Sequence, residues 1–187
     1  RDLPVVSIIG YTNAGKSTLL NNLTKSRVRA ENRLFATLDP ASRRMKFPRD
    51  KEIIITDTVG FIRDLPQELM TAFRATLEEL ENADLLLHVI DISHAQFENQ
   101  VQSVERILGD LKLEHIALLR VLNKQDRLTP EELTRRSNIL NGIPICARDT
   151  ETLSPLIDTL DHYFATGQMM LKPPGRPTWQ VPPSLSR

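Results

Sequence analysis

The stretch "VVSIIGYTNAGKSTLLNNLT", residues 5–24, decides the fold of this chain. It reads as a buried strand over 5–10, a loop that fits the pattern G-x-x-x-x-G-K-[ST], and a helix over 16–24. In this pattern the backbone N–H groups of residues 13–17 surround a phosphate group, and the helix N-terminus adds its positive dipole end. The stretch therefore predicts a phosphate-binding loop inside an α/β domain.

Further apolar runs alternate with helical patterns along most of the chain. The expected strands after the first are residues 42–47, 52–57, 85–92, 116–123 and 143–147. Only "PRDK" separates the first two of these, which is too short for a crossover helix, so that pair should be antiparallel and lie at an edge. The sequence predicts a doubly wound α/β domain with a mainly parallel six-stranded sheet and one antiparallel edge strand.

Helix starts and the domain boundary are also visible in the sequence. Asp64 and Thr129 are each followed three residues later by Gln or Glu, which predicts helix N-termini there. Behind the first lies an apolar stripe that we expect to be core, made of Leu65, Leu69, Phe73, Leu77 and Leu80. Five prolines follow position 172, so we expect one domain over 1–164 and an extended, proline-rich tail or linker over 165–187.

Composition limits the class of protein. A chain of 187 residues can bury a core without disulfides or structural metal. Its single cysteine, Cys146, and four histidines without metal-ligand spacing favour a reducing compartment. No apolar run approaches the roughly 18 residues that span a bilayer. We expect a cytoplasmic protein, with loose membrane association as an alternative; a start at Arg1 without methionine indicates that an upstream portion is missing.

Charge is unevenly distributed although the net charge is zero. Residues 25–51 carry a net +6 and residues 65–110 a net −7. Solvated helix and loop faces explain this pattern, and so does a basic surface beside phosphates or RNA. Both readings stay open at this point.

The base that accompanies the phosphates is indicated by "NKQD", Asn123 to Asp126, at the end of the fifth expected strand. The Asp126 carboxylate can accept two hydrogen bonds from the N1–H and 2-amino groups of guanine. Adenine lacks this donor pair and would leave the acceptor unpaired, at a cost of a few kcal/mol. This segment favours a guanine nucleotide over the alternative of a P-loop kinase or ATPase.

The segment "CAR", Cys146 to Arg148, follows the last expected strand. Its position matches the Ser-Ala-Lys segment of GTPases, so we assign the Ala147 N–H to guanine O6. Cys146 replaces the usual serine, and an ordinary strand-end loop remains the alternative.

Three segments carry a family resemblance. "GYTNAGKSTLLNNLT", "NRLFATLDPASRR" and "DTVGFIRDLPQELMTAFRATLEE" closely resemble the HflX family of P-loop GTPases of the translation-factor class. Such proteins bind the large ribosomal subunit and can split ribosomes under stress, and the resemblance implies this role. Family members carry a further N-terminal domain, so the resemblance also implies an excised GTP-binding domain. We expect this chain to be monomeric.

The resemblance implies several roles in the switch segments. Thr37 matches the threonine whose hydroxyl ligates Mg²⁺ and whose carbonyl orients water; Ser42 is the substitute candidate. Asp57 holds Mg²⁺ through a water, and the Gly60 N–H contacts the γ-phosphate. These two contacts would make segments 30–43 and 58–66 respond to the γ-phosphate.

Phe61 stands at the position after Gly60 where a glutamine is usual. Its side chain offers water neither a hydrogen-bond donor nor an acceptor. Lys16, Mg²⁺ and the loop amides would then supply the electrostatic stabilisation. We expect slow intrinsic GTP hydrolysis that ribosomes stimulate; a nucleotide-gated ribosome- or RNA-binding module, or a ribosome-assembly GTPase, with incidental hydrolysis is the alternative. Asn13 is either a helper of K⁺ binding or an ordinary loop residue. Arg33, Arg43 and Arg44 are candidate charge donors in cis, and a basic switch that faces RNA explains them as well.

The predicted site is as follows. Catalytic roles fall to Lys16, Thr37 and Gly60, and Mg²⁺ is assigned to Ser17, Thr37 and Asp57. GTP or GDP is assigned to Gly10, Asn13, Ala14, Gly15, Lys16, Ser17, Thr18, Asp57, Gly60, Asn123, Lys124, Asp126, Cys146, Ala147 and Arg148.

Overall fold

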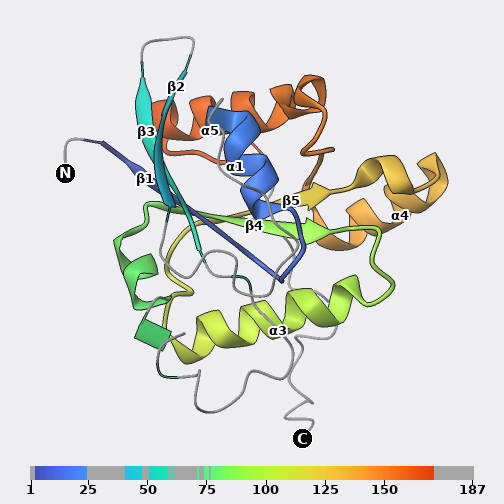
Figure 1. The fold of residues 1–187 in the computed structure, drawn as a ribbon, viewed down its shortest axis with the longest axis horizontal. Helices are drawn as coiled ribbons and strands as arrows, with labels where there is room; N and C mark the ends of the chain where they lie inside the picture. Colours follow the sequence, from blue (N-terminus) through green and yellow to red (C-terminus); the bar gives the residue numbers. More distant parts are fainter. Residues whose placement is uncertain are drawn as a thin grey trace, which may run out of the picture.

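The centre of the fold is a twisted six-stranded sheet with the strand order β2-β3-β1-β4-β5-β6 (Figure 1). The computed structural model describes residues 3–24, 41–47, 51–58, 60, 71, 74–75 and 77–170. The strands are β1 (Val5–Gly10), β2 (Ala41–Lys46), β3 (Glu52–Asp57), β4 (Leu85–Asp91), β5 (Leu118–Asn123) and β6 (Ile143–Pro144).

Strand directions confirm the predicted fold class. β2 pairs with β3 in antiparallel register, from Ala41 opposite Asp57 to Lys46 opposite Glu52. The remaining neighbours, β3-β1, β1-β4, β4-β5 and β5-β6, are all parallel. β4 is buried over its first six residues, as expected for a parallel strand covered on both faces.

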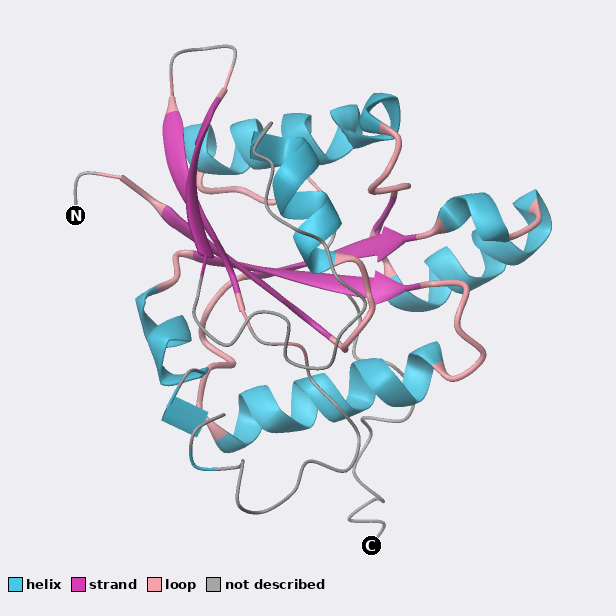
Figure 2. Cartoon of the chain, viewed as in Figure 1, coloured by secondary structure: helices cyan, strands magenta, loops and turns pink. Residues whose placement is uncertain are grey.

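Helices cover both faces of the sheet (Figure 2). They are α1 (Lys16–Thr24), α3 (Phe97–Asp110), α4 (Pro130–Leu140) and α5 (Ser154–Thr166), with short 3₁₀ turns η1 (Glu79–Asn82), η2 (Gln125–Arg127) and η3 (Thr150–Leu153). α1 and α5 lie on one side of the sheet and α3 on the other (Figure 1). The parallel strand ends after β1, β4 and β5 meet at one edge, so the loops that follow them come together there.

Apolar side chains pack on both faces of the sheet. On the α1–α5 face, Leu19 and Leu156 pack with inward side chains of β1 and β3. On the α3 face, Leu77, Leu80 and Val104 pack together beneath the sheet. The buried Leu77 and Leu80 are therefore core, as predicted for the last two positions of the apolar stripe, while its earlier positions and the Asp64 helix start lie outside the described residues.

The expected Thr129 helix start is confirmed. The Thr129 side chain accepts a hydrogen bond from the Glu132 N–H at 3.3 Å, and Pro130 occupies the first turn, where its missing N–H costs nothing. The tail over 173–187 lies outside the described residues. α5 runs two residues past the predicted boundary at 164 and ends at Gly167, which has a φ of 71°.

The predicted strand over 143–147 is too long. Only Ile143 and Pro144 pair with β5 as a strand. Pro144 has no N–H to donate, and the Cys146 N–H then turns away to the Thr152 hydroxyl at 2.9 Å. The fifth strand likewise begins at Leu118, two residues later than predicted.

Candidate nucleotide-binding site

The loop between β1 and α1 is fixed by a turn and by the strand beside it. Ala14 N–H donates to the Tyr11 carbonyl at 3.1 Å. Gly15 has a φ of 101°, and a Cβ there would lie 2.2 Å from Asn123 Nδ2. No side chain can be accommodated at that distance, so Gly15 allows the loop to approach the end of β5.

Lys16 lies at the first turn of α1 and is buried. Its ammonium donates to the Tyr11 carbonyl at 3.3 Å. Burial lowers the pKa of Lys16, and the nearby Asp57 carboxylate opposes that shift. A Cβ on Gly60 would lie 3.1 Å from Lys16 Nζ and 3.0 Å from Thr12 Cα, which places Gly60 against the phosphate loop.

A hydroxyl and a carboxylate meet beside Lys16. Ser17 Oγ donates to Asp57 Oδ2 at 3.0 Å, and Asp57, at the end of β3, is only 1% exposed. The next residue, Thr58, anchors the strand end by donating its hydroxyl to the Ile8 carbonyl at 2.7 Å. Hard oxygen donors of this kind fit Mg²⁺, which takes few protein ligands and keeps its waters. Among the described residues, no group of three or more His, Cys, Asp or Glu side chains forms a larger metal site.

Asn123, at the end of β5, joins two loops. Its side-chain amide donates to the Ala14 carbonyl at 2.8 Å, and its side-chain oxygen accepts from the Ala147 N–H at 2.8 Å. Asn123 is 3% exposed, so both bonds are shielded from water. Asn22 of α1 also donates to the Ala147 carbonyl. One side chain thus holds the phosphate loop and the loop after β6 in register.

Asp126 lies in the short turn η2, beyond Lys124, which has a left-handed backbone with a φ of 66°. Gln125 N–H donates to the Ile145 carbonyl at 3.1 Å, which brings this turn against the loop that contains Cys146. The Asp126 side chain is exposed and available to a ligand. In this structure the Ala147 N–H is used by Asn123, so its assignment to guanine O6 stays a prediction.

The comparisons with known proteins agree with this arrangement. A family profile described as "50S ribosome-binding GTPase" matches residues 5–124. A GTPase HflX of Magnetococcus marinus is 46% identical over 176 residues, which cover 92% of this chain and 40% of that protein. This chain belongs to the HflX family of GTPases. A GTPase HflX of Caldanaerobacter subterraneus is 52% identical over 126 residues, which cover 67% of the HflX-family chain and 29% of the relative.

Solved structures place the fold among GTP-binding proteins. A GTP-binding protein of Sulfolobus solfataricus in complex with GDP superposes with a TM-score of 0.72 at 28% identity, over 88% of the HflX-family chain and 53% of that chain. The chain therefore spans less than half the length of the curated relatives described above and about half of this one. Among the described residues, no helix of the HflX-family chain has the length and apolarity needed to cross a bilayer.

The structure brings most predicted site residues together. Lys16, Ser17, Asp57 and Gly60 form one group, and the Asn13, Asn123, Lys124 and Ala147 contacts form a second at the same edge of the sheet. Gly10 ends β1, Thr18 lies in α1, and Arg148 is exposed after β6.

Several switch residues of the HflX-family chain, Thr37, Phe61 and Arg33, lie outside the described residues. Ser42, the substitute for Thr37, shares a 3.1 Å hydrogen bond with the Thr56 hydroxyl across the β2-β3 pair. Arg43 donates to the Ser42 carbonyl at 2.9 Å. Their predicted roles toward the phosphates stay predictions.

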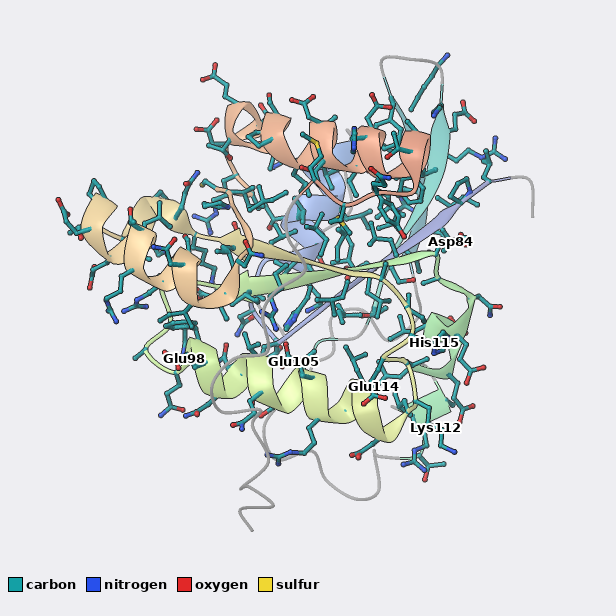
Figure 3. All side chains as sticks on the ribbon, turned by 180° about the vertical axis from the view of Figure 1, so that it is seen from behind. Asp84, Glu98, Glu105, Lys112, Glu114 and His115 are labelled. Carbon is teal, nitrogen blue, oxygen red and sulfur yellow. The ribbon has the colours of Figure 1, made fainter. Side chains whose placement is uncertain are left out.

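A buried polar cluster lies on the α3 side of β4 and β5 and was not predicted. Arg120, in β5, forms an ion pair with Glu105 and donates to the Leu140 carbonyl at 2.9 Å. Glu105 lies on α3 (Figure 3). His88 lies directly opposite Arg120 in the register and is 1% exposed. Burial, together with the positive charges of Arg120 and Lys16, lowers the pKa of His88 to about 3. His88 is therefore neutral in the folded protein at physiological pH.

Sequence reasoning also missed Asp91, the last residue of β4. Its carboxylate accepts from Lys124 Nζ at 2.7 Å. A polar residue at the carboxyl end of a buried parallel strand was the available signal, because such ends line the ligand edge of the sheet.

Proposed function

We propose that this chain binds GTP and GDP with Mg²⁺ and hydrolyses GTP at the β,γ-phosphoanhydride, as the GTP-binding domain of a large-subunit-associated protein. The observation that carries the proposal is the joining of the two groups through Asn123. A buried lysine and a Ser17–Asp57 pair lie at one end of the loop, and the guanine segment is tied to the same loop. The residues proposed to bind the phosphates and those proposed to bind the base would thereby lie at a fixed distance from one another.

The residues of the chain have distinct parts in this chemistry. Lys16 would neutralise charge on the β- and γ-oxygens, and the loop amides would do the same from fixed positions. Ser17 and Asp57 would hold Mg²⁺, directly and through a water, and the bound ion would neutralise further charge on the phosphates. The Gly60 N–H would contact the γ-phosphate, and Thr37 would complete the metal shell. Asp126 would select guanine.

Hydrolysis by the isolated chain is expected to be slow, because nothing at position 61 can polarise water. The family description, with its reference to 50S ribosome binding, supports stimulation by the large subunit. Asn13 is a candidate helper of K⁺ binding, since it lies in the loop with an exposed side chain. A rate comparison in KCl and NaCl tests this role, and equal rates would dismiss it.

The decisive experiment measures single-turnover hydrolysis of GTP and ATP by the chain, with and without purified large subunits. We expect GTP to be preferred and its hydrolysis to accelerate with subunits. Equal rates for both nucleotides would refute the base assignment, whereas GTP binding without any hydrolysis would favour a nucleotide-gated binding module. The Asp126→Asn variant should shift preference from GTP to XTP, with Asn138→Ala on the exposed face of α4 as a control.

A further inference from the structure

Lys124 is held in an unusual conformation at the edge of the site. Its φ of 66° lies in the left-handed region, which costs free energy for any residue with a Cβ. Its ammonium donates to the Asn13 carbonyl at 2.8 Å, in the phosphate loop. Asn13 itself has a φ of 63°. A further contact of the ammonium is therefore needed to hold the Lys124 side chain against the phosphate loop.

Asp91 supplies the second contact of that ammonium. Asp91 Oδ2 accepts from Lys124 Nζ at 2.7 Å, and the lysine side chain is only 22% exposed. Two of the three ammonium protons are thus directed at a carboxylate from β4 and a carbonyl from the phosphate loop. A charged acceptor at this distance gives a stronger bond than a neutral one.

The carboxylate is itself well positioned. Ser93 donates to Asp91 Oδ1 twice, from its N–H at 3.1 Å and from its hydroxyl at 2.5 Å. Burial opposes ionisation of Asp91, but the hydrogen bonds from Lys124 and Ser93 outweigh it and lower the pKa of Asp91. The side chain is therefore ionised at neutral pH.

The loop that follows Asp91 is anchored from two other elements. Arg136 of α4 donates to the Ile92 carbonyl at 2.8 Å and lies over the Phe97 ring, 5.1 Å from its centroid. Ile92 N–H donates to the Asn123 carbonyl at 3.0 Å. The Asp91 carboxylate consequently lies at the end of a strand whose following loop is held by hydrogen bonds from α4 and to β5.

We propose that Asp91 is a positioning residue: it fixes Lys124 against the phosphate loop and so prolongs the residence of the bound guanine nucleotide. This inference rests on the proposed function and deepens it. It concerns the lifetime of the bound nucleotide, because Lys124, which Asp91 contacts, belongs to the second group of contacts, away from the Lys16–Gly60 group.

The test measures dissociation of fluorescent GDP from the 187-residue chain and its variants. Asp91→Ala should raise the dissociation rate about tenfold, the effect of losing one charge-assisted hydrogen bond. Lys124→Ala should raise it by at least as much. In the double variant, Asp91→Ala should add less than about twofold, because both changes break the same contact.

Controls separate positioning from general loss of structure. Asp110→Asn removes an exposed carboxylate at the end of α3 and should leave dissociation unchanged. If Asp91→Ala does not fold, Asp91→Asn keeps the side-chain shape and takes its place. Dissociation equal to the Asp110→Asn control, or fully additive effects with Lys124→Ala, would overturn the inference alone. A wild-type chain that fails to retain GDP would overturn the proposed function and the inference with it.

Discussion

Replacement of Asn123 by alanine should destabilise the chain even without nucleotide. The side chain is 3% exposed and makes hydrogen bonds of 2.8 Å to both the Ala14 carbonyl and the Ala147 N–H. Each buried hydrogen bond contributes about 1 to 1.5 kcal/mol net, and the orphaned partners add a desolvation cost, so the expected loss is about 3 kcal/mol. For a chain of this size, that loss lowers Tm by about 6 to 12 °C.

Urea unfolding of the nucleotide-free chain, followed by circular dichroism, measures this loss. The m-value should not change, since the surface exposed on unfolding is the same. Asn138→Ala, on the exposed face of α4, is the matched control and should change stability by no more than a few tenths of a kcal/mol. A loss below about 1 kcal/mol for Asn123→Ala would show that the two loops are held together by other contacts, and the reasoning from these bonds would fail.

Three further predictions concern the buried groups and the switch glycine. The pKa of His88 is about 3 in the folded protein, below its unfolded value, so on acidification the unfolded chain takes up the proton first. The free energy of unfolding should therefore fall by about 1.2 kcal/mol between pH 7.0 and 5.5. His88→Leu should remove this part of the pH dependence, measured by urea unfolding. Arg120→Met should cost about 3 kcal/mol by removing both the ion pair with Glu105 and the hydrogen bond to the Leu140 carbonyl, and adding Glu105→Met should recover part of the loss in the same assay. Gly60→Ala should slow single-turnover GTP hydrolysis about tenfold to a hundredfold, because the added methyl would lie 3.0 Å from Thr12 Cα and 3.1 Å from Lys16 Nζ.

Each of these has a contrary result. If the free energy of unfolding depends on pH in the same way in wild type and His88→Leu, His88 is protonated in the folded protein. A double variant of Arg120 and Glu105 that is less stable than the sum of the single changes would contradict the argument from their ion pair. An unaltered hydrolysis rate in Gly60→Ala would show that the backbone at position 60 can shift without disturbing the phosphate loop.

The phosphate loop could be predicted from sequence because its pattern combines chain geometry and chemistry. The bounds of β1, α1 and β3 agree with their sequence predictions to the residue. The motif requires a strand before it and a helix after it. The strand "EIIITD" is bounded on both sides by polar residues. The Thr129 cap was predictable for the same reason: the bond lies within four residues.

Contacts between distant segments could not be predicted in this way. Arg120 stands in an apolar strand, and its partner Glu105 lies on α3, so only the packed fold explains why a charge is buried there. Ala147 was assigned to guanine by position, but the competing bond to Asn123 depends on how closely two loops approach. Asp91 lies within the predicted strand over 85–92, but its contact with Lys124 joins residues 33 positions apart in the sequence.

The β2 strand has a consequence for handling the protein. It is the last strand on its side of the described sheet and carries Arg43, Arg44 and Lys46. A strand edge rich in cations repels the same edge of a second molecule, which discourages strand-to-strand aggregation. This repulsion depends on salt, since the screening length falls from about 10 Å at 0.1 M to about 3 Å at 1 M. Concentrated solutions of the protein should therefore resist aggregation longest in buffers of low ionic strength.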